Sequence, residues 1–250
     1  KERIAMPNME SISFQRFSGR YRALQQHSQV IDASLTRTFN SLKPNRNNGK
    51  TITDTLRISS NKYPKLNIPC TEYARVINYS RRENSDYCFL ELYNLFAYYM
   101  KDILMEMYKL RPKSITEKSN KTLTYSKLTE FSSIDELADY MIDDIFKELE
   151  SLRSTQKLVK RIVGHTKIQI PQALSDEALM YLNIRHLIIH NNSKVDKDFY
   201  DKYRNRLSIT PNGKVPTDYQ TFQAALNAIH EYVRTIDEQL IAKNFITART

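Results

Sequence analysis

A short polar run inside an otherwise apolar segment carries the groups best suited to acid–base chemistry. Arg185, His186 and His190 stand in the order Arg-His-Leu-Ile-Ile-His. On a helix, the two histidines lie about 40° apart around the axis, one turn above the other. An imidazole can move protons near neutral pH, while a guanidinium stays charged and can stabilise a phosphorane. The three residues therefore suit RNA cleavage by the neighbouring 2′-hydroxyl.

A helix must present these groups. Ser175 is a plausible N-cap, because Asp176 and Glu177 follow in the first turn, and apolar residues then continue to about Asn191. Upstream, residues 86–110 are apolar nearly all round, which is typical of a central bundle helix. The last helix is predicted from an unbroken apolar stripe formed by Phe222, Leu226, Ile229, Val233, Ile236 and Leu240.

The remaining pattern predicts further helices and one turn. An apolar stripe predicts a helix over residues 11–41. In residues 45–84 the apolar residues do not recur at regular steps, which predicts a long irregular connection. Ser133 and Glu136 form a capping box, and residues 155–163 suggest a short helix closed by Gly164. Residues 206–216 alternate and turn at Asn212-Gly213, which predicts a β-hairpin.

The predicted fold class is therefore all-α, an up-and-down helical bundle with a small β-hairpin before the last helix. We expect two parts. Residues 1–85 form a basic N-terminal helix with a long loop extension, and residues 86–250 form the bundle.

Positive charge is concentrated at the N-terminus. Residues 1–82 carry 15 Lys and Arg against 5 Asp and Glu, which accounts for the whole formal net charge of +10. Arg16 and Arg20 belong to this excess, and guanidinium groups bind phosphates bidentately. We therefore expect them to contact RNA, although a merely solvated basic face is the alternative.

Composition excludes several classes of protein. Only 4 of 250 residues are glycine, 40% are hydrophobic, and no apolar stretch reaches the roughly 20 residues that span a bilayer. Two cysteines, Cys70 and Cys88, suggest a reducing, cytoplasmic setting. Two cysteines cannot form a Cys-rich zinc cage, so we expect no metal. Glycine-rich phosphate loops are absent, so we expect no nucleotide cofactor.

The segment around Arg185 and His190 resembles the Arg-polar-x-x-x-His signature of the HEPN superfamily of ribonucleases. The resemblance covers roughly residues 86–245 and is nearest to members from bacterial defence and toxin–antitoxin systems. It implies a homodimer in which two motif helices face one cleft, with metal-independent cleavage that leaves a 2′,3′-cyclic phosphate. An antitoxin or another defence protein is an implied partner. One branch of the family has tyrosine where this chain has Asn192, so regulation through that tyrosine is not expected.

By position, the resemblance makes Arg185 the phosphate and transition-state ligand and His190 the acid–base residue. His186 would be the supporting polar residue, and we expect it to contact the substrate with Asn191 and Lys194.

Other interpretations of the same residues stay open. His186 and His190 could ligate zinc, although Leu187 stands where zinc proteases carry glutamate. Arg185 and His190 could also be a structural polar pair at a helix end. Arg22 and His27 have the same spacing, and we interpret them as part of a solvated helix surface. The spacing of arginine and histidine alone is therefore weak evidence for an active site. A non-catalytic RNA-binding or protein-binding module is the alternative function.

Overall fold

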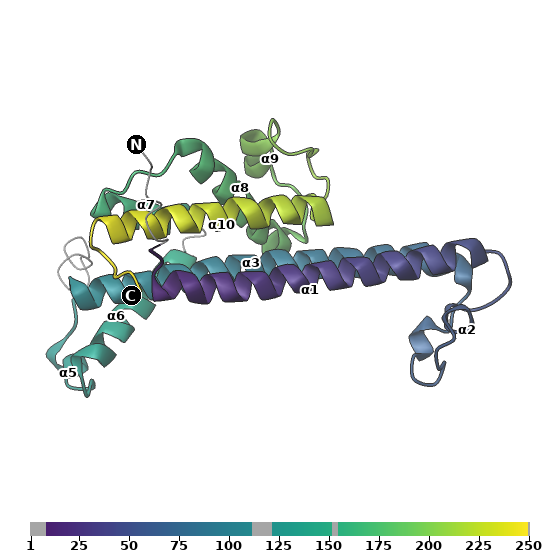
Figure 1. The fold of residues 1–250 in the computed structure, drawn as a ribbon, viewed down its shortest axis with the longest axis horizontal. Coiled ribbons are helices and arrows are strands. Elements are labelled where there is room, and N and C mark those ends of the chain that lie inside the picture. Colours follow the sequence, from purple (N-terminus) through teal and green to yellow (C-terminus); the bar gives the residue numbers. More distant parts are fainter. Residues whose placement is uncertain (1–8, 112–121, 152–154, 250) are drawn as a thin grey trace, which may run out of the picture.

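The computed structural model describes residues 9–111, 122–151 and 155–249. Four long helices form the bundle shown in Figure 1: α1 (Ile12–Leu42), α3 (Tyr73–Leu110), α8 (Gln172–Asn191) and α10 (Tyr219–Ala242). Both α1 and α8 pack against α3 and α10, which places α1 and α8 at opposite corners of the bundle. The all-α fold class is confirmed.

Shorter helices complete the described chain. They are α2 (Ile52–Leu56), α5 (Tyr125–Leu128), α6 (Ile134–Ser151), α7 (Thr155–Thr166) and α9 (Lys197–Tyr203), with 3₁₀ turns at Lys43–Asn45, Pro64–Leu66 and Cys70–Glu72. The predicted cap at Ser133 is present, because its hydroxyl accepts the Glu136 amide at 3.1 Å. Among the described helices, none combines the length and apolar character needed to cross a membrane.

A buried carboxylate joins three of the bundle helices. Asp237 of α10 is 1% exposed. It accepts hydrogen bonds from the Ser11 amide at 2.9 Å, the Ser11 hydroxyl at 2.5 Å and the Tyr99 hydroxyl at 3.1 Å. Ser11 is also the N-cap of α1, since its hydroxyl accepts the Phe14 amide. Burial raises the pKa of Asp237, and these hydrogen bonds oppose that shift.

The far halves of α1 and α3 extend together well beyond α8 and α10 and end at α2 (Figure 1). We call residues 35–85 the arm. A small separate core closes its tip, formed by Leu42, Ile52, Cys70, Tyr73 and Ile77. The arm carries ten Lys and Arg against three Asp and Glu. Most of the N-terminal charge excess therefore lies on a projecting element.

The second long helix begins earlier than its apolar pattern predicts. It starts at Tyr73 and continues without a break through residue 86, so the predicted division at residues 85 and 86 falls inside α3. Phe14 and Phe17 of α1 belong to the same hydrophobic core as α3 and α10. The first part of α1 is thus built into the bundle, and residues 35–42 at its end belong to the arm.

The predicted β-hairpin over residues 206–216 is wrong. The turn itself exists, because the Gly213 amide donates to the Thr210 carbonyl at 3.0 Å. However, the Val195 amide bonds to the Gly213 carbonyl, and the Val215 amide bonds to the Ser193 carbonyl, each at 2.8 Å. This segment therefore pairs with the loop after α8 as an isolated bridge, which uses the backbone groups that a hairpin would need.

Candidate active site

The C-terminal end of α8 lies where the arm leaves the bundle. Arg185 lies over Tyr93 of α3, and the Ser193 hydroxyl, two turns farther along, donates to Asp86 of α3 at 2.7 Å. The two helices therefore run in opposite directions, and the end of α8 reaches the arm root, the region around Asp86. The motif is thereby placed next to the strongly basic arm.

Asp86 also fixes the loops around the motif. Its second carboxylate oxygen accepts the Thr217 hydroxyl at 2.7 Å, so one side chain holds the loop after α8 and the loop before α10. Asn192 and Ser193 both have left-handed backbone conformations, with φ of 50° and 56°. The Lys214 ammonium donates to the Asn192 carbonyl, which satisfies an acceptor at the end of α8.

Two imidazoles meet on the solvent side of α8. The ring centroids of His186 and His190 are 4.8 Å apart, with the planes inclined by 45°. His190 is exposed and His186 is half-buried. Two adjacent imidazoles can act as proton acceptor and proton donor in one reaction.

The Arg185 guanidinium is held by an aromatic ring. Its central carbon lies 4.6 Å from the centroid of the Tyr93 ring, and within the described residues it makes no ion pair. A stacked guanidinium keeps its N–H edges available for a phosphate. On an ideal helix Arg185 and His190 project about 140° apart. Within one copy of the chain, the imidazoles of His186 and His190 therefore lie together, and the Arg185 guanidinium lies to one side of them.

Asn191 and Lys194, two further residues predicted to contact the substrate, lie at the same end of α8. The Asn191 carbonyl accepts the Lys194 amide at 2.9 Å, which closes the helix, and the Lys194 side chain is exposed. Lys194 thus adds positive charge beside the histidines.

Arg16 and Arg20 lie in another region of the bundle. Arg16 pairs with Asp102 at 3.8 Å, and Arg20 lies 4.9 Å over the Tyr98 ring. Tyr98 and Asp102 are about 140° to 180° around α3 from Tyr93. The fold therefore does not bring these two arginines to the end of α8.

Arg16 instead lines a cavity of about 900 Å³ between α1 and α10, together with Arg22, Arg234, Arg249 and His230. Burial lowers the pKa of His230, which packs 4.7 Å from the Tyr21 ring. The positive charge of this cavity comes from its arginines.

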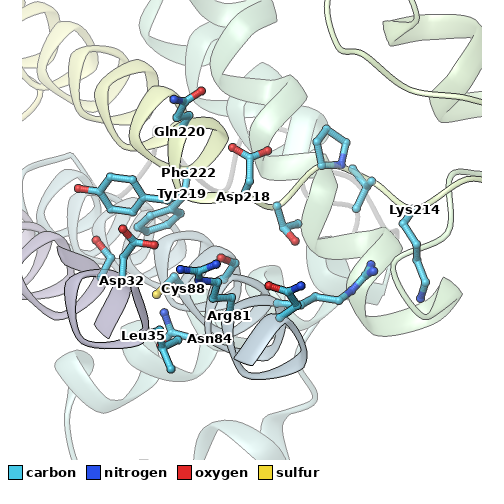
Figure 2. Close-up of a pocket in the computed structure, with 17 residues that line it drawn as sticks. Asp32, Leu35, Arg81, Asn84, Cys88, Lys214, Asp218, Tyr219, Gln220 and Phe222 are labelled. Atoms are coloured by element: carbon cyan, nitrogen blue, oxygen red, sulfur yellow. The ribbon is translucent and has the colours of Figure 1, made fainter. Parts of the chain in front are cut away.

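A further cavity lies at the arm root and was missed by the sequence analysis (Figure 2). It is lined by residues of α1, of α3 and of the segment leading into α10, including the adjacent Arg81 and Arg82. This arginine pair was visible in the sequence, but nothing local indicated that residues 214–222 would cover it.

Neither similarity to a known protein nor a metal site assigns a function to the end of α8. No family model matches the chain, and neither a curated protein nor a solved structure matches it. Within the described ranges, no cluster of three or more His, Cys, Asp or Glu side chains could hold a metal ion, so His186 and His190 have no third ligand there.

Proposed function

We propose that the protein is a metal-independent endoribonuclease that cleaves single-stranded RNA at the end of α8. The observation that carries this proposal is the position of the paired imidazoles of His186 and His190 at the root of the basic arm. The HEPN-like motif supports the same chemistry and suggests a role in phage defence or in a toxin–antitoxin system.

In this proposal the arm binds the RNA substrate. Ten cationic side chains against three anionic ones attract a phosphate backbone through release of its counterions. A strand that follows the arm towards the bundle reaches Lys214, Lys194 and then the histidines. Salt should therefore weaken binding steeply.

The proposed reaction needs only side chains. His190 accepts the proton of a 2′-hydroxyl, whose oxygen forms a bond to the adjacent phosphorus. The bond from phosphorus to the 5′-oxygen breaks, and protonated His186 gives its proton to that oxygen. Arg185 stabilises the charge that grows on the phosphorane. The products are a 2′,3′-cyclic phosphate and a 5′-hydroxyl.

A second copy of the chain would complete this site. Arg185 and His190 project from different sides of α8, so an arginine from one copy can serve the histidines of another across a two-fold axis. Mixing Arg185→Ala with His190→Ala protein tests this arrangement. A mixed dimer would keep one intact site, so cleavage should return to about a quarter of the wild-type rate for random pairing. No recovery would refute a shared site.

Cleavage itself is tested with purified full-length protein, total RNA and EDTA. We expect fragments with 2′,3′-cyclic phosphate ends, and we expect Arg185→Ala and His190→Ala to abolish them. Arg22→Ala and His27→Ala are matched controls, because this pair has the same spacing on α1, and both should cleave normally. Cleavage that requires an added metal ion would refute the mechanism.

The basic arm also favours a second candidate, a non-catalytic RNA-binding module. In that case wild-type protein would bind RNA with steep salt dependence and leave it intact. An antitoxin or another defence protein is the proposed partner in either case.

A further inference from the structure

The cavity at the arm root has the size of a small-molecule site. Its volume is about 730 Å³, within the range of roughly 300 to 1,000 Å³ typical of ligand pockets. Figure 2 shows Arg81 and Asn84 of α3 on one side and Asp218 and Gln220, at the start of α10, on the other. Three separate segments of the chain thus contribute to one concave surface.

Two guanidinium nitrogens of the arginines that line this cavity lack partners. Arg81 Nε and Arg82 Nη2 are covered by neighbouring atoms and make no hydrogen bond within the described residues. Arg81 is held in place from its other side, where Nη2 donates to Thr36 Oγ1 at 2.9 Å and the guanidinium lies 5.2 Å over the Phe39 ring. Buried donors without acceptors are costly. An anionic ligand would supply the missing acceptors once the two guanidinium groups turn toward the cavity.

The carboxylates of the lining do not fill this role. Asp218 caps α10 by accepting the Thr221 amide at 3.0 Å and the Thr221 hydroxyl at 2.8 Å. Asp32 makes no ion pair with either arginine within the described residues. With Lys214 as a third cation, the lining retains a net positive charge.

The rest of the lining suits a flat, polar ring. Leu35 gives an apolar surface, and Cys88 and Phe222, each 1% exposed, lie beneath it. Burial raises the pKa of the Cys88 thiol to about 11, so that it stays uncharged. Gln220 adds an amide group that can both donate and accept hydrogen bonds, and Asn84, whose oxygen lies 3.2 Å from His27 Nε2, adds an amino group that can donate. The cavity therefore combines anion binding with recognition of a heterocycle's edge.

We propose that this cavity binds one nucleotide, with the phosphate on Arg81 and Arg82 and the base between the amide groups and the apolar surface. The nucleotide can come from solution or from an RNA strand lying along the arm. This proposal does not depend on cleavage at α8.

Calorimetric titration of full-length His190→Ala protein tests the site, because RNA cannot then be lost to the proposed cleavage. The ligands are the four nucleoside 5′-monophosphates, the matching nucleosides, inorganic phosphate and a single-stranded hexanucleotide. At least one monophosphate should bind at least about tenfold more tightly than its nucleoside and than phosphate alone. A hexanucleotide that binds more tightly still, and whose binding is weakened by Arg82→Gln, identifies a strand as the source; a hexanucleotide whose binding does not respond to Arg82→Gln identifies a free nucleotide, because the arm alone then holds the strand.

Arg82→Gln should weaken monophosphate binding at least about tenfold, while Arg37→Gln, an exposed arginine of the arm, should not change it. Gln220→Ala should alter the preference among bases, and thermal unfolding checks that each variant is folded. The proposal is overturned if no monophosphate binds at about 1 mM, if phosphate alone binds equally well, or if Arg82→Gln binds like wild type.

Discussion

Replacing Asp86 by alanine should release the two loops that meet at the end of α8. Its carboxylate is the shared acceptor of the Ser193 and Thr217 hydroxyls, each at 2.7 Å. These residues are 107 and 131 positions away in the chain. The substitution leaves both hydroxyls without this acceptor and removes the only long-range polar link described between these loops and α3.

The size of the effect follows from these two bonds. A hydrogen bond to a charged group contributes about 1.5 to 3 kcal/mol, and partial exposure of Asp86 favours the lower end of that range. Together they predict a loss of about 3 kcal/mol in the local opening free energy, or about a hundredfold faster exchange. Asp86→Asn keeps one acceptor oxygen and should lose about half as much.

Hydrogen exchange of the Val195 and Val215 amides is the assay, because these amides bridge the two loops at 2.8 Å. Asp54→Ala is the matched control. Asp54 also accepts a hydroxyl at 2.7 Å, but that hydroxyl belongs to Thr51, three residues away at the tip of the arm. The control should leave both valine amides protected. Unchanged exchange of Val195 and Val215 in Asp86→Ala would refute the role given to this carboxylate.

Four further perturbations test the bundle. Ser11→Ala should lower the free energy of unfolding by about 3 kcal/mol, because an N-cap and a hydrogen bond to a buried carboxylate are both lost; a loss below about 1 kcal/mol in urea would contradict this account. Burial raises the pKa of Asp237, so its stabilising contribution is present at low pH and is lost as the pH rises through the folded-state pKa. Wild-type stability relative to Asp237→Asn should therefore fall as the pH rises above about 4. Burial lowers the pKa of His230, so its contribution is present above the unfolded pKa and is lost on acidification; His230→Gln should lose less stability than wild type between about pH 7 and 5 in urea unfolding. Tyr93→Leu removes the ring under Arg185 and should lower stability by about 1 kcal/mol more than Tyr93→Phe does; equal losses in thermal unfolding would exclude a stabilising stack.

The helices whose apolar residues recur at regular steps could be predicted from the sequence. The stripe from Phe222 to Leu240 is buried throughout α10, and the predicted cap at Ser133 is present. Both features depend on residues within a few positions of each other, so the local pattern contains the needed information. The order Arg185, His186, His190 likewise fixes which groups share the end of α8.

Long-range partners could be decided only by the folded chain. The segment around Gly213 pairs with the loop after α8 and not with its own neighbours, because that loop is held against α3 by Asp86. Arg16 lies at the opposite corner from α8, and Arg81 with Arg82 is enclosed by the start of α10. The packing of helices against one another sets such placements, and helical spacing within one segment says nothing about which segment will cover it.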